Sequence, residues 1–133
     1  MRIELASVFV DDQREALAFY RDVLGFEKRR DIPLGDDSWL TVVSPESPSG
    51  PELLLEPASH TAVGPFRRAL VEDGIPAAQF TVDDVATEYA RLRAAGVTFV
   101  REPTVLCRSF REHPLVSRPL AFCLLIAGFF PLP

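Results

Sequence analysis

SVFVDD (residues 7–12) and QFTVDD (residues 79–84) are two versions of one short pattern, and each opens the same succession of elements. In both, an alternating stretch ends in two aspartates, a helical stretch continues to Leu24 or Ala95, and a glycine precedes another extended stretch. Alternation is typical of a strand, and glycine is typical of a helix end. The chain is therefore predicted to contain two tandem copies of one strand-helix-strand unit.

The helical stretches carry their own start and stop signals. Asp12 and Asp84 are suited to the N-cap position, and Gly25 and Gly96 are suited to the left-handed residue that ends a helix. A further short helix is predicted from Pro65 to Asp73, because proline is favoured in the first helical turn. Helical spacing predicts that one stripe of the first helix is buried, formed by Ala16, Leu17, Tyr20, Val23 and Leu24.

The strands are expected to have two different faces, because successive side chains point to opposite sides of a sheet. One face is predicted to lie under the helices and comprises Ala6, Val8, Val10, Leu40, Val42, Leu53, Leu55, Ala78, Phe80 and Val82. The other mixes aromatic, polar and acidic side chains, which suits either a small-molecule cleft or an ordinary solvated sheet face. The predicted cleft residues are Leu5, Ser7, Phe9, Trp39, Thr41, Glu52, Leu54, Glu56, Ala77, Gln79 and Thr81.

Composition excludes several classes of partner. The chain has 133 residues, 47% hydrophobic and 25% charged, which favours one compact domain with a sizeable core. It carries 14 Lys and Arg against 19 Asp and Glu, so neither nucleic acid nor an anionic membrane is an expected partner. Cys107 and Cys123 form no CxxC pair, and Arg2 and Glu4 interrupt any signal-like segment, so we expect a cytoplasmic protein.

The chain resembles the glyoxalase/bleomycin-resistance/extradiol-dioxygenase superfamily, which has the vicinal oxygen chelate (VOC) fold. The resemblance rests on VFVDD (8–12), ALAFYRDVLGF (16–26), DD (83–84) and LRAAGV (92–97), and it covers about residues 2–104. It implies an α+β fold in which tandem βαβββ repeats form a curved mixed sheet with helices outside, the second repeat being atypical or incomplete. The implied single VOC-like domain comprises a first module (1–57), a linker with a short helix (58–75), a second module (76–104) and a divergent C-terminal tail (105–133).

The resemblance also bears on metal binding. Metal-dependent members of the family hold a divalent cation with His, Gln or Glu side chains from four strands. Two of the corresponding positions are Leu5 and Ala77, which cannot bind a metal, whereas Glu52 matches the family carboxylate. The resemblance therefore implies a protein that binds a small molecule without a metal or other cofactor, closer to bleomycin resistance proteins than to glyoxalases.

Two other functions stay open. A metal-dependent lyase, isomerase or dioxygenase would use a divalent metal at Glu52 with atypical ligands such as Gln79, Glu56 or His60. The second of these is a scaffold protein whose cleft is vestigial and binds no ligand. The sequence shows no nucleophilic triad, and His60 and His113 both lie in expected loops.

The segment after Pro103 carries none of the family's motifs. It is interpreted as an alternative strand-forming end that includes Leu120 to Ile126, as a membrane anchor, or as a sequence read out of its ancestral frame. The anchor is disfavoured, because the apolar stretch between Pro119 and Pro131 is shorter than the roughly 20 residues of a spanning helix. An incomplete second copy would leave a sheet edge uncovered, so we expect a symmetric homodimer.

Overall fold

The computed structural model describes residues 1–75, 77–78, 80–99 and 121–122. The chain forms two compact units, residues 1–68 and residues 69–133. Within the described ranges, no helix combines the length and the apolar character that crossing a membrane requires.

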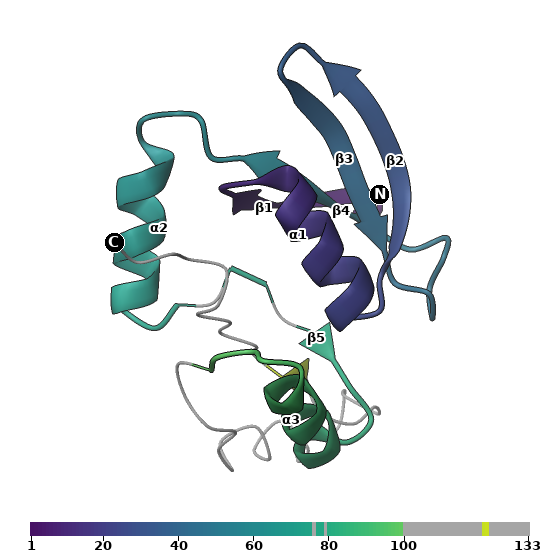
Figure 1. The fold of residues 1–133 in the computed structure, drawn as a ribbon. Coiled ribbons are helices and arrows are strands. Elements are labelled where there is room, and N and C mark those ends of the chain that lie inside the picture. The colour runs from purple at the N-terminus through teal and green to yellow at the C-terminus, as the bar shows by residue number, and fades with distance from the viewer. Residues whose placement is uncertain (76, 79, 100–120, 123–133) are drawn as a thin grey trace. The chain divides into compact units, whose positions relative to one another are not determined.

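The first unit is built on a four-stranded mixed sheet with the strand order β1-β4-β3-β2 (Figure 1). β1 (Leu5–Val10) pairs in parallel with β4 (Glu52–Pro57). β3 (Asp37–Val43) pairs antiparallel with β4 and with β2 (Glu27–Leu34). The α+β class and the strand-helix-strand-strand-strand order of the first repeat are thus confirmed.

The first helix begins and ends where its sequence signals predict. α1 (Gln13–Ala18) starts after Asp12, whose carboxylate accepts hydrogen bonds from the backbone N–H groups of Arg14 and Glu15. The helix continues as one wider π turn, η1 (Phe19–Val23), and Gly25 then adopts a φ of 80°. A positive φ is readily accessible to glycine, so Gly25 lets the chain leave the helix and enter β2.

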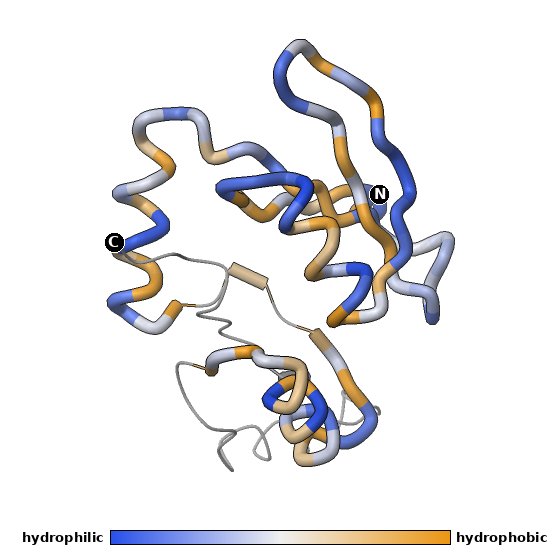
Figure 2. Tube along the Cα trace, viewed as in Figure 1, coloured by the Kyte–Doolittle hydropathy of each residue, from blue (hydrophilic) through white to orange (hydrophobic). Residues whose placement is uncertain are grey.

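The core of the first unit lies between α1 and one face of the sheet. The Gln13 amide group donates 2.7 Å hydrogen bonds to the carbonyl oxygens of Ser38 and Leu55, and so holds α1 against β3 and β4. The fully buried residues Leu40, Val42 and Leu55 were all assigned to this face. Figure 2 shows that hydrophobic residues recur along α1 and along these strands.

Some burial expectations need correction. Ala6, expected under the helix, is exposed, and Leu53 is half-buried. The helical stripe is fully buried only at Ala16 and Leu17. Its last three residues, Tyr20, Val23 and Leu24, are half-buried, because the π turn changes the helical spacing on which the stripe was predicted.

The predicted short helix is present as α2 (Val63–Glu72), which starts slightly before the expected Pro65. The second unit contains β5 (Phe80–Thr81) and α3 (Val85–Ala94). Asp84 caps α3 by accepting a 2.7 Å hydrogen bond from the Thr87 N–H, which confirms the repeated start signal.

β6 (Ala121–Phe122) pairs antiparallel with β5. This short pairing matches the strand-forming interpretation of the tail at the two residues that the structure describes there. The rest of the predicted tail strand, up to Ile126, lies outside the described residues, as do the further strands of a complete second repeat.

Candidate functional site

The face of the first sheet opposite the helix brings together side chains from all four strands. Residues directly opposite each other on neighbouring strands share a face, and the register places Ser7 beside Leu54, Leu54 beside Thr41, and Thr41 beside Arg30. We call this surface the open face. Its residues are Leu5, Ser7, Phe9, Arg30, Ile32, Trp39, Thr41, Glu52, Leu54 and Glu56.

Large apolar side chains are exposed on the open face. Leu5 and Phe9 on β1 are each 37% exposed, Trp39 on β3 is 36% exposed, and Ile32 on β2 is 50% exposed. Ile32 and Trp39 are direct partners across the β2–β3 hairpin. A contiguous apolar surface with aromatic residues and a few polar groups is typical of a ligand-binding surface.

A cluster of three polar side chains lies on this face. The Thr41 hydroxyl donates a 2.7 Å hydrogen bond to Glu52 Oε2. The Arg30 guanidinium donates a 3.1 Å hydrogen bond from Nε to the other carboxylate oxygen, Oε1, and its Nη2 forms an ion pair with the same oxygen at 3.0 Å. Thr41 is fully buried and the Glu52 side chain is 12% exposed, whereas the Arg30 side chain is 52% exposed. The cluster therefore presents a guanidinium, rather than a carboxylate, to the surroundings.

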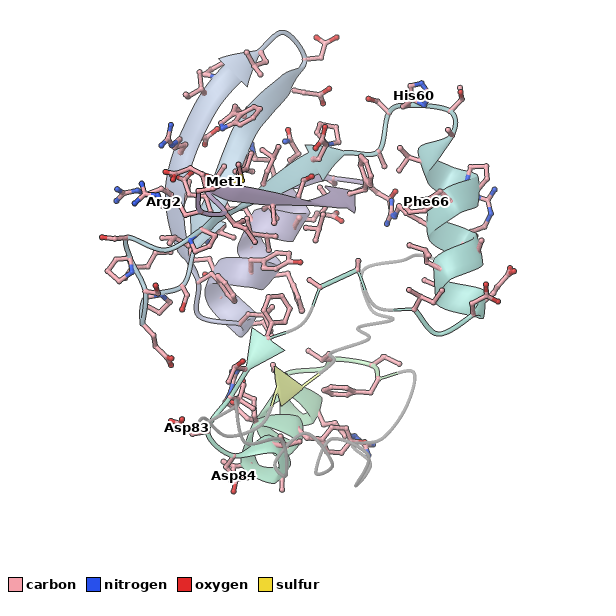
Figure 3. All side chains as sticks on the ribbon, turned by 180° about the vertical axis from the view of Figure 1, so that it is seen from behind. Met1, Arg2, His60, Phe66, Asp83 and Asp84 are labelled. Carbon is pink, nitrogen blue, oxygen red and sulfur yellow. The ribbon has the colours of Figure 1, made fainter. Side chains whose placement is uncertain are left out.

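The residues of the open face do not fit a divalent-metal site. Both oxygens of Glu52 are engaged by Arg30 and Thr41, and the residue beside Glu52 on β1 is Leu5. The His60 imidazole accepts a 3.1 Å hydrogen bond from the Ala62 N–H in the exposed turn before α2 (Figure 3). Across the residues described, no group of three or more His, Cys, Asp or Glu side chains could hold a metal ion.

The predicted cleft residues fall into two sets. The eight from the first copy, Leu5 to Glu56, lie on the open face, although Thr41 and Leu54 are buried beneath its surface. Ala77 and Thr81 are exposed residues of the second unit. Gln79 lies outside the described residues.

Arg30 and Ile32 were not predicted to lie on the open face, because polar and apolar residues do not alternate regularly along β2. Its sequence, EKRRDIPL, carries five successive charged positions before the first apolar residue. The pairing with β3 also shifts by one residue between Lys28 and Arg30, so a simple count of alternate positions assigns the wrong face on one side of the irregularity. The usable signal was the excess of basic residues on β2, the strand next to Thr41 of β3.

A second ion pair fixes the end of β1. Asp11 directly follows β1, and its carboxylate is held by Arg67 of α2, which donates from Nη1 and, at 3.0 Å, from Nη2. The Arg67 side chain is only 9% exposed. Asp11 therefore connects β1 to α2 instead of contributing to the open face.

Two further groups have shifted pKa values on the helix side of the sheet. Burial raises the pKa of Tyr20 to about 12. The Arg14 guanidinium, at 2.7 and 3.1 Å from the Asp31 carboxylate, lowers the pKa of Asp31 below its ordinary value, and Lys28 adds to this effect. These groups support the fold and lie away from the open face.

Comparisons with known proteins identify the family to which the chain is similar. Residues 2–113 match the model of the Glyoxalase/Bleomycin resistance protein/Dioxygenase superfamily. The chain is 47% identical over 104 residues to the uncharacterized protein YurT of Bacillus subtilis (strain 168), a match that covers 78% of this chain and 82% of YurT.

Solved structures agree with this match. The crystal structure of UcmS2 is 35% identical to the chain, with a TM-score of 0.66 over 78% of this chain and 81% of UcmS2. TnmS3, an antibiotic binding protein from Streptomyces sp. CB03234, is 27% identical, with a TM-score of 0.55 over 78% of each chain.

Proposed function

Because the chain belongs to the Glyoxalase/Bleomycin resistance protein/Dioxygenase superfamily, we propose that it binds a small organic molecule on the open face without a metal ion. The observation that carries this proposal is that partly exposed apolar side chains, Phe9, Trp39 and Leu5, share one sheet face with the Arg30 guanidinium. Such a surface offers stacking area together with a directional polar contact. The likeness to TnmS3, an antibiotic binding protein, supports an antibiotic-like organic compound as the ligand.

The state of Glu52 favours binding over a metal-dependent lyase, isomerase or dioxygenase reaction. Arg30 and Thr41 each donate to one of the two carboxylate oxygens, and a cation that binds Glu52 would have to approach the positively charged guanidinium of Arg30. Releasing Glu52 would leave the buried Thr41 hydroxyl and the guanidinium without this acceptor. Metal binding would therefore have to compensate for the lost hydrogen bonds.

A ligand-stabilisation screen tests the proposal. The protein is dialysed against EDTA, and its melting temperature is measured with a panel of antibiotics of different chemical classes, bleomycin included. A compound that binds only the native state stabilises it by about 2.7 kcal/mol at a concentration of 100 Kd. Stabilisation in EDTA is the expected result.

The other outcomes identify the competing functions. Stabilisation that requires added zinc, nickel, iron or manganese would indicate the metal-dependent alternative. Absence of stabilisation with every compound, in EDTA and with metal, would contradict binding and favour a scaffold.

We also propose that two copies form a symmetric homodimer near the open face, with the segment after Pro103 contributing. β1 is an edge strand of the sheet that the structure describes, and Ile3 and Leu5 at this edge are 71% and 37% exposed. An edge strand presents backbone N–H and C=O groups that can pair with another chain. Apolar side chains at the same edge would add buried area to that pairing.

A further inference from the structure

We infer that Arg30 selects the ligand: the open face takes an aromatic molecule that presents an acceptor oxygen, from a carbonyl or a carboxylate. This inference rests on the proposed function and specifies its ligand class.

The geometry of the guanidinium leaves one of its edges available. A guanidinium has five N–H donors, and in Arg30 the edge formed by Nε and Nη2 faces Oε1 of Glu52, with a hydrogen bond from Nε and an ion-pair contact from Nη2. Arg30 makes no other hydrogen bond to the residues that the structure describes. Both N–H groups of Nη1 and the second N–H of Nη2 therefore remain for a ligand, and they form the fork that matches a carboxylate or a carbonyl.

The donor is held in place before a ligand arrives. Glu52 is fixed from below by the 2.7 Å hydrogen bond from Thr41, a fully buried residue, and its own side chain is 12% exposed. Glu52 in turn holds the Nε and Nη2 edge of the Arg30 guanidinium through one hydrogen bond and one ion-pair contact. A ligand then loses less affinity to the ordering of this long side chain than it would with an unanchored arginine.

The neighbouring pair of residues defines the aromatic part of the ligand. Ile32 and Trp39 oppose each other two residues along the strands from the pair Arg30 and Thr41. Two residues of a strand span about 7 Å, and side chains two apart point to the same face. A bicyclic aromatic ring placed on Trp39 would thus bring an oxygen substituent to Arg30.

Four naphthalenes of nearly equal size test the inference: 2-naphthoate, 2-acetylnaphthalene, 2-ethylnaphthalene and 2-naphthylmethylammonium. Trp39 is the single tryptophan of the chain, so its indole N–H gives one assigned NMR signal on the open face. Each dissociation constant is obtained by titrating this signal in the full-length protein. The same titrations are carried out with Arg30→Gln and with the control Arg29→Gln, which changes the neighbouring exposed residue.

The expected result is a preference for the acceptor oxygen. The naphthoate and the ketone should bind about tenfold or more tightly than the ethyl compound, the size expected of hydrogen bonds to a charged group, and the ammonium compound, which has no acceptor oxygen, should not share this gain. Arg30→Gln should remove the preference, and Arg29→Gln should keep it.

Two kinds of result would overturn the inference. Equal binding of all four compounds, or the same preference after Arg30→Gln, would reject the role of Arg30 while leaving the proposed function standing. Absence of binding by all four would reject the ligand class, and the antibiotic screen would then show separately whether the proposed function also fails.

Discussion

Thr41 donates a 2.7 Å hydrogen bond to Oε2 of Glu52, and Thr41 itself has no exposed surface. This buried contact connects the core of the sheet to the charged group on its open face. It makes the Thr41 hydroxyl a support for the candidate site and not a part of its surface.

Replacing Thr41 by valine should destabilise the protein. Thr41→Val keeps the shape of the side chain but removes the donor, which leaves Glu52 Oε2 without its partner in a poorly solvated position. We expect a loss of about 1 to 3 kcal/mol in the free energy of unfolding, measured by urea denaturation. The matched control is Thr61→Val in an exposed turn, which should change stability by no more than about 0.5 kcal/mol. Equal losses in the two variants would show that the buried hydrogen bond is not important.

Stability should fall at alkaline pH because of Tyr20. Its pKa is raised by burial from 10.0 to about 12, so the folded protein holds the phenol proton more tightly than the unfolded chain does. The resulting stabilisation is complete below pH about 10 and is lost as the pH rises toward about 12, by roughly 2 to 3 kcal/mol. In Tyr20→Phe this component of the loss should disappear. Identical pH profiles of stability for the two proteins from about pH 9 to about pH 12 would refute the assignment of this loss to Tyr20.

The purified protein should contain no stoichiometric divalent metal. Glu52 is already engaged by Arg30, and Leu5 occupies the neighbouring position on β1. Elemental analysis after dialysis should therefore find far less than one zinc, nickel, iron or manganese ion per chain, excluding ions held by a purification tag. About one ion per chain that disappears in Glu52→Ala would contradict the metal-free account.

The homodimer makes a prediction about mass in solution. Light scattering of the full chain should give twice the mass of one 14.8 kDa chain. A chain that stops after Thr104 should show a weaker dimer if the tail contributes to the contact. A monodisperse monomer of the full chain would exclude the dimer, and an unchanged dimer after truncation would show that the tail takes no part.

Much of the first unit could be predicted because local physical signals determine it. Asp12 and Gly25 mark the ends of a helical segment through hydrogen bonding and backbone freedom, which act within a few residues. The alternation of residues around Leu40 and Val42 likewise identifies the buried face of the strand from neighbouring positions alone. Neither inference needs knowledge of distant contacts.

The features that sequence reasoning missed depend on contacts between distant residues. Arg67 is buried because Asp11, 56 positions earlier, accepts its hydrogen bonds. Arg30 reaches Glu52 from a strand whose pairing is irregular, and the pattern of its neighbours contains no sign of that irregularity. The boundaries of the second module at residues 76 and 104 stay a prediction, as does the role of Ala77, Gln79 and Thr81 in the site.

The most direct test of the account is the location of ligand binding. The compound that gives the largest stabilisation in the antibiotic screen is titrated into the wild type, Phe9→Ala, Trp39→Ala and Phe66→Ala, by calorimetry in EDTA. Phe66 is the matched control, since it is 54% exposed on α2 and is not one of the open-face residues. The account predicts that Phe9→Ala and Trp39→Ala each weaken binding by about tenfold or more, and that Phe66→Ala leaves it unchanged. Unchanged affinity in both open-face variants, or a loss confined to Phe66→Ala, would contradict the claim that the open face binds the ligand.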